Sequence, residues 1–157
     1  MQKITPFLWF DDRAEEAMEF YTSVFKNSKI GTVTRFGDEV PGPKGKVMTG
    51  TFQIEGQEFM VLNGGPEFKF TEAISFFVHC ENQEEVDYLW EKLSTGGEKG
   101  QCGWLKDKFG VSWQIVPNIL SELMCDPDAE KARRVTKAML QMTRLDIKLL
   151  KQAYENG

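Results

Sequence analysis

The side chains best suited to ligand chemistry lie in one segment, Cys102 to Pro117, with the sequence CGWLKDKFGVSWQIVP. Two runs rich in aromatic and apolar residues flank a short turn that ends in Gly110, a residue that tolerates positive φ. This pattern predicts a β-hairpin. A loop at 108–110 places Trp104 opposite Gln114 and leaves an apolar face on the other side. The face of Trp104 and Gln114 also carries Lys106 and Ser112. We therefore expect a sheet that packs on one side and lines a small-molecule pocket on the other.

Trp104 and Gln114 are the first candidates for ligand binding. The indole would form a platform, and the amide would orient a small molecule. The alternative is cross-strand packing, with the amide bonded to backbone. Lys106 is either an anion contact or a solvated residue beside Asp107.

Three further ligand-binding candidates are Ser75, His79 and Asn63. Histidine exchanges a proton most readily near neutral pH, so His79 is the natural acid–base candidate; the alternative is a polar residue at a strand end. Ser75 lies on the same face of the predicted strand as His79. Asn63 ends a strand before Gly64-Gly65, where backbone can approach a ligand closely; the alternative is a turn residue. We predict no catalytic residue.

Composition limits the classes of function. The chain has 157 residues, 41% hydrophobic and 27% charged, as in ordinary globular proteins, and its net charge of −5 disfavours nucleic-acid binding. No apolar run is long enough for a membrane span, and the first residues lack the features of a secretory signal, so we expect a cytoplasmic protein. Three cysteines without paired spacing predict reduced thiols rather than a disulfide framework.

The chain repeats one pattern twice. A strand over 4–10 leads to Asp12 and Glu15, a capping pair, and then to an apolar stripe at helical spacing. A strand over 74–80 leads to Asn82 and Glu85 and a second such helix. Further β-rich runs follow each helix, with only a short or irregular one expected in 96–102. We predict a β-α-β-β-β unit used twice, with a breaker-rich loop over 37–46.

The remaining residues predict a helical tail. Asp126-Pro127-Asp128 resembles a helix start with proline at the first helical position. Thr143 begins a second such sequence, with Asp146 three residues on. We expect a break near 141–144 and a last helix to about Tyr154.

The doubled unit, the start FLWFDDRAEEAMEFY and the hairpin sequence together resemble the vicinal oxygen chelate (glyoxalase, bleomycin resistance and dioxygenase) superfamily. Within it they resemble the PhnB-like branch, which carries a 3-demethylubiquinone-9 3-methyltransferase domain label. The resemblance implies an α+β fold: two βαβββ modules that form a curved mixed sheet around a cavity, with C-terminal helices. It implies a single glyoxalase-like domain, with module one at about 3–65, module two at about 73–117 and the tail at about 118–155. It also implies homodimers.

The resemblance also implies four cavity-facing positions that hold a metal in the superfamily's enzymes. On this chain they fall near Pro6, within 59–63, at Ser75 and at Gln114, with Asn63 the only donor in the second group. An amide, a hydroxyl and another amide do not suit a divalent cation, so we predict no metal and no cofactor. Methyl transfer is also not expected, because no GxGxxG follows a strand.

The leading hypothesis is a PhnB-like protein that binds a small molecule in an aromatic-lined cavity without a metal. An alternative is a superfamily enzyme of the lyase, isomerase or dioxygenase type, or a metal-free variant that uses His79. A third is a dimeric module regulated through its terminal helices.

Overall fold

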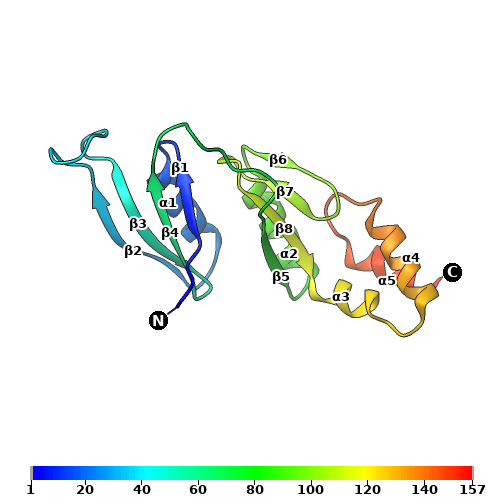
Figure 1. Ribbon diagram of the computed structural model, residues 1–157. Helices are drawn as coiled ribbons and strands as arrows, with labels where there is room; N and C mark the ends of the chain where they lie inside the picture. Colours follow the sequence, from blue (N-terminus) through cyan, green and yellow to red (C-terminus); the bar gives the residue numbers. More distant parts are fainter. Residues whose placement is uncertain (1, 157) are drawn as a thin grey trace. The chain divides into compact units, whose positions relative to one another are not determined.

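The strand and helix pattern that occurs twice in the sequence forms two separate four-stranded sheets (Figure 1). The computed structural model describes residues 2–156, which divide between Lys69 and Phe70 into two compact units. We call them unit 1 and unit 2. The order of elements confirms the predicted α+β class and the doubled β-α-β-β-β unit. In residues 2–156, no helix combines the length and the apolar character that crossing a bilayer requires.

Unit 1 contains one helix and one sheet. Its elements are β1 (Phe7–Phe10), α1 (Ala14–Val24), β2 (Ser28–Arg35), β3 (Val47–Ile54) and β4 (Gln57–Asn63). The strand order is β1-β4-β3-β2, with β1 parallel to β4 and the other pairs antiparallel. The apolar stripe of α1 is buried, which explains why these residues form a helix. Its buried members are Ala14, Ala17, Met18, Tyr21 and Val24.

Unit 2 repeats this arrangement and adds a tail. Its elements are β5 (Phe76–Cys80), α2 (Gln83–Ser94), β6 (Glu98–Lys99), β7 (Trp104–Lys106) and β8 (Ser112–Pro117). The strand order β5-β8-β7-β6 matches that of unit 1. Strand β6 has two residues, as the irregular sequence there predicts.

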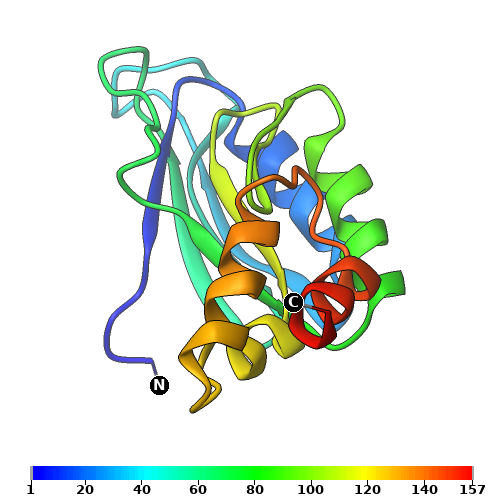
Figure 2. The ribbon, with the colours of Figure 1, turned by 90° about the vertical axis from the view of Figure 1, so that its right-hand side faces the viewer.

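The tail forms three helices: α3 (Asn118–Met124), α4 (Ala129–Met139) and α5 (Ile147–Glu155). Figure 2 shows α4 and α5 side by side. The predicted break at 141–144 is confirmed, but the predicted start of α4 is wrong by two residues. Asp128 is the cap and accepts hydrogen bonds from the amides of Glu130 and Lys131, so Pro127 precedes the helix.

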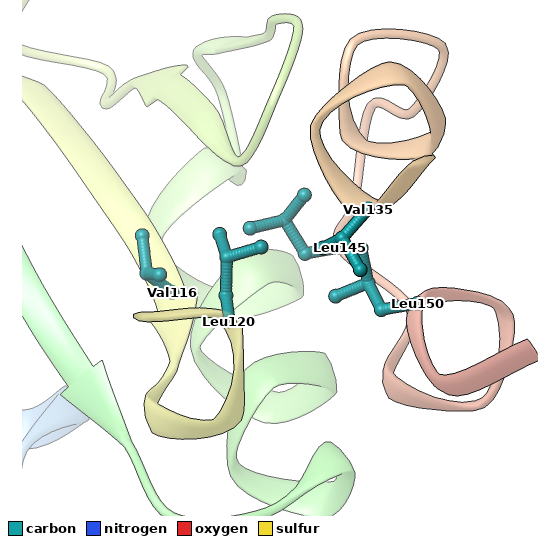
Figure 3. Packing of buried hydrophobic residues seen from close by; sticks show 5 residues of the cluster. All are labelled: Val116, Leu120, Val135, Leu145 and Leu150. Carbon is teal, nitrogen blue, oxygen red and sulfur yellow. The ribbon is translucent and has the colours of Figure 1, made fainter. Parts of the chain in front are cut away.

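A cluster of buried aliphatic side chains joins the tail to the end of β8 (Figure 3). It consists of Val116, Leu120, Val135, Leu145 and Leu150. Burying each such side chain contributes about 1.5–3 kcal/mol. The Gln83 side chain of α2 adds polar links, donating to the Leu145 carbonyl at 3.0 Å and accepting from the Ile147 amide at 2.7 Å. The tail is therefore an integral part of unit 2.

The two long helices of the repeats begin differently. Asn82 caps α2 as predicted, accepting a hydrogen bond from the Glu85 amide at 2.9 Å. The predicted cap of α1 at Asp12 is wrong: Arg13 holds that place and makes no side-chain cap bond. Asn63, at the end of β4, instead accepts a hydrogen bond from the Ala14 amide at 2.9 Å. A residue distant in sequence thus accepts the hydrogen bond that a local N-cap residue would otherwise accept.

The first strand also faces the opposite way from our expectation. The resemblance implies a cavity-facing position near Pro6, and the alternation of side chains along a strand then predicts that Leu8 and Phe10 face the cavity and that Phe7 and Trp9 pack on the helix. Leu8 and Phe10 are instead buried, and they pair with Val61 and Asn63, which lie on the side of α1. Phe7 is 48% exposed on the other side.

Candidate functional site

The sheet of unit 2 has one face covered by α2 (Figure 1). On the other face the tail helices pack on Val116 at the end of β8 and leave Phe77 and His79 exposed. We call this second face the open face. Residues on the covered side are buried, among them Leu105, Trp113, Ile115 and Cys80. The open face carries the alternate residues of the same strands, and these include Trp104, Gln114, Phe77 and His79.

The strand register places an amide between two aromatic residues. Trp104 lies opposite Gln114 across β7 and β8, as predicted, and Phe77 lies beside Gln114 across β5 and β8. Trp104 and Gln114 are half-buried, and Phe77 is 45% exposed. We call these three residues the Gln114 row. It can contact a small molecule both by ring surfaces and by hydrogen bonds.

Gln114 is held in place by its neighbour. Its Nε2 donates a hydrogen bond to the Ser75 Oγ at 3.0 Å. The exposed His79 lies two residues after Phe77 on the same face of β5. The ring centroids of the two residues are 4.9 Å apart, and their planes are tilted by 52°. Ser75, His79, Trp104 and Gln114 thus lie on one face of one sheet.

Asn63, the fifth predicted site residue, lies elsewhere. It belongs to unit 1, is buried, and faces α1. Its Nδ2 donates to the Val47 carbonyl at 2.9 Å, and its Oδ1 accepts from Ala14. Both ends of the amide are therefore engaged with backbone.

The hairpin turn depends on a residue that sequence reasoning treated as an ordinary turn position. Asp107 is 2% exposed. Its Oδ1 accepts hydrogen bonds from the amides of Phe109 and Val111 at 2.9 and 3.0 Å, and its Oδ2 accepts from the Trp113 indole at 2.9 Å. The carboxylate fixes the turn between β7 and β8, the strands that carry Trp104 and Gln114. The sequence signal for this role was an aspartate at the start of a turn, because aspartate side chains in turns accept hydrogen bonds from the backbone amides that follow them.

Lys106 forms an ion pair with Glu72 at the edge of the open face. The hydrogen bond and charge of the ammonium hold the pKa of the Glu72 carboxyl below its usual value. The pair is exposed to solvent, so its contribution to stability is small.

Replacing Lys106 with methionine should raise the pKa of Glu72 toward its ordinary value. Because the folded pKa is lowered, the pair stabilises the fold above the ordinary carboxylate pKa, and this contribution disappears as pH falls through the folded value. An NMR titration of side-chain carboxyls checks this, with Glu130 of α4, whose pKa is lowered by Arg133, as the reference in the same variant. An unchanged Glu72 midpoint would contradict the pairing.

The thiol of Cys80 is not an activated nucleophile. Cys80 is buried, and desolvation together with the nearby Glu85 carboxylate raises the pKa of its thiol to about 12. A protonated thiol is a poor nucleophile.

Two surface pockets lie away from the open face. One of about 470 Å³ in unit 2 is bounded by Trp90, Lys99 and the connection between α4 and α5. The other, of about 380 Å³, lies at the start of α1 among acidic side chains and touches Asn63. Neither includes Gln114, Trp104, Ser75 or His79.

Comparison with known proteins agrees with this architecture. Residues 2–116 match the family described as 3-demethylubiquinone-9 3-methyltransferase. A Bacillus cereus PhnB protein, described as a 3-demethylubiquinone-9 3-methyltransferase, is 43% identical. The alignment covers 74% of this chain and 99% of that chain, with a TM-score of 0.70.

The chain belongs to this family. The predicted membership of the PhnB-like branch is confirmed. The family match ends at residue 116, so the tail helices lie outside it.

Two further structures share the fold. A protein from Pseudomonas aeruginosa is 21% identical, with a TM-score of 0.64 and coverage of 74% of this chain and 98% of that chain. A fosfomycin resistance protein from Listeria monocytogenes is 15% identical, with a TM-score of 0.53 and coverage of 78% and 97%. Among curated proteins, none matches the chain.

The repeated topology identifies which residues stand at equivalent places in the two units. Phe7 in β1 and Phe77 in β5 each lie three residues before the end of the first strand of their unit. Phe7 pairs with Met60, and Phe77 pairs with Gln114. Met60, rather than Asn63, is therefore the counterpart of Gln114. A thioether, an amide and the Ser75 hydroxyl are poor ligands for a divalent cation. Among residues 2–156, no group of three or more His, Cys, Asp or Glu side chains could hold a metal ion.

Proposed function

We propose that this protein binds a small organic molecule on the open face of unit 2 and needs no metal to do so. The observation that carries the proposal is the Gln114 row: an amide, tethered by Ser75, between two accessible aromatic residues. Aromatic surface with a few placed polar groups is typical of small-molecule sites.

The donor set supports independence from metals. Gln114 stands where metal enzymes of the superfamily that this chain resembles hold a cation. Its amide already donates a hydrogen bond to a serine hydroxyl. Hard divalent cations favour carboxylates, and zinc favours imidazole or thiolate. His79 is the one imidazole on this face, and a single such ligand does not make a metal site.

Methyl transfer, which the family description names, is not part of the proposal. Nucleotide cofactors commonly bind at a glycine-rich turn between a strand and a helix. The connection from β1 to α1 is Asp11-Asp12-Arg13, and that from β5 to α2 is Glu81-Asn82. Neither contains glycine, which supports assigning this chain a binding role.

A thermal-unfolding screen of the full chain, first stripped with a chelator, tests the proposal. Organic compounds are compared with Mn²⁺, Co²⁺, Ni²⁺ and Zn²⁺. We expect organic ligands at about 100 times their Kd to raise Tm by roughly 5–10 °C. These ligands should shift the NMR signals of the Trp104 indole and the Gln114 amide. In Gln114→Leu, the organic compounds of the screen should no longer differ in the Tm shifts that they cause.

Stoichiometric binding of a divalent cation that is lost in Gln114→Leu would overturn the proposal and favour a metal enzyme. Turnover of a bound compound that depends on His79 would favour the metal-free enzyme. We further propose a cytoplasmic homodimer, which light scattering coupled to size exclusion and cell fractionation would check.

A further inference from the structure

We propose that the open face of unit 2 selects an uncharged, flat aromatic ring that carries a cyclic-amide edge. The ring would lie between Trp104 and Phe77, and Gln114 would recognise its edge. This inference rests on the proposed function and names the class of ligand for the same site.

The spacing of the strands fits a single flat ring. Trp104 and Phe77 each pair with Gln114, on β7 and β5 respectively. Neighbouring strands are about 4.8 Å apart, so the two aromatic residues rise from strands separated by on the order of 10 Å. Side chains stand roughly perpendicular to a sheet. One planar ring that contacts each wall at about 3.5–4 Å needs about 7–8 Å between the walls, so the two side chains would lean toward each other above Gln114 to hold it. A saturated ring is thicker and lacks the π-surface that stacks on aromatic side chains.

The amide of Gln114 selects the edge of that ring. A glutamine amide has two N–H donors and an oxygen with two lone pairs. One N–H binds Ser75, and no hydrogen bond to Oε1 is found among residues 2–156. Gln114 therefore keeps an acceptor and a donor close together. The adjacent N–H and C=O groups of a cyclic amide complement this pair. A ring without them would leave a half-buried amide unpaired, at a cost in affinity.

The charges around the Gln114 row favour a neutral ligand. Lys106, the nearest cation on β7, is paired with Glu72. The row itself contains no carboxylate and no ammonium group. The imidazole of His79 lies beyond Phe77 along β5, with the two ring centroids 4.9 Å apart. An ion held between Trp104 and Phe77 would therefore lose water without a carboxylate or ammonium group beside it, which is unfavourable.

NMR titration of the ¹⁵N-labelled full chain with three probes tests the inference. The probes are 2-quinolone, 1-methyl-2-quinolone, which lacks the N–H donor, and 2-piperidone, which has the amide edge but no aromatic ring. We expect 2-quinolone to bind about 10-fold more tightly than either reference, the difference expected from one hydrogen bond or one aromatic contact. It should shift the Trp104 indole and Gln114 amide signals.

Variants assign the contacts. Trp104→Ala and Phe77→Ala should each weaken 2-quinolone binding about 5- to 10-fold. Gln114→Leu should remove the preference for 2-quinolone over its N-methyl form. Tyr88→Ala is the matched control: Tyr88 is 45% exposed, as Phe77 is, but lies on α2, and this variant should bind as the unaltered protein does.

The inference is overturned if 2-quinolone binds no more tightly than 2-piperidone, or if Phe77→Ala leaves its affinity unchanged. Organic ligands that shift Gln114 without any preference for aromatic lactams overturn this inference and leave the proposed function standing. Stabilisation by divalent cations alone overturns both.

Discussion

Asp107→Ala is expected to lower the free energy of unfolding of unit 2 by about 3 kcal/mol, one of the two largest effects in this protein. The substitution leaves the Val111 amide and the Trp113 indole N–H without their acceptor, and both groups are buried. Each such donor left unpaired costs about 1–3 kcal/mol. Urea unfolding followed by amide exchange of the β7 and β8 residues measures the loss.

Two further variants separate this effect from mere disturbance of the hairpin. Asp107→Asn keeps one oxygen for the backbone amides but turns an N–H toward the Trp113 indole, so we expect about half the loss. Ser112→Ala alters an equally buried residue of the same hairpin, whose Oγ has no hydrogen-bond partner in the part of the chain that the structure describes. This variant should lose nothing and gain up to about 1 kcal/mol. Equal losses in Asp107→Ala and Ser112→Ala would show that the carboxylate is not the cause.

Strand faces could be predicted from the sequence in unit 2 but not in unit 1, for a physical reason. Polar Ser75, just before β5, and His79 within it alternate with apolar Phe76 and Val78, so the pattern itself identifies the open face. In β1, the sequence Phe7–Phe10 is apolar at every position. Either set of alternate residues could therefore pack against the helix. Only contact with α1 decides the matter, and that contact depends on the tertiary fold.

The same distinction explains the errors at individual residues. Asn82 could be recognised because its partner, the Glu85 amide, is three residues away. Asn63 caps a helix that begins 49 residues earlier, and no local pattern reports such a bond. The burial of Asp107 was not predicted, because it depends on how the Trp113 indole folds over the turn. The Trp104–Gln114 pairing was predictable, because hairpin register follows from the turn.

Asn63→Ala is expected to lower the free energy of unfolding of unit 1 by about 3 kcal/mol. The Asn63 side chain joins the start of α1 to the beginning of β3 through two hydrogen bonds of 2.9 Å each. Both of its partners, the Ala14 amide and the Val47 carbonyl, belong to buried residues. Loss of the side chain leaves one buried donor and one buried acceptor unpaired.

Asn82→Ala is the matched control, because it removes the same amide from the start of the other helix at an exposed position. Water can replace that cap, so the expected loss is about 1 kcal/mol. Amide exchange at Ala14 and Glu85, with urea unfolding of both variants, makes the comparison. Asn63→Asp adds a further distinction, since it keeps the acceptor for Ala14 but opposes the Val47 carbonyl with an oxygen; it should be at least as destabilising as Asn63→Ala. If Asn63→Ala instead cost no more than Asn82→Ala and weakened binding of an organic ligand, Asn63 would be a site residue and not the link between α1 and β3.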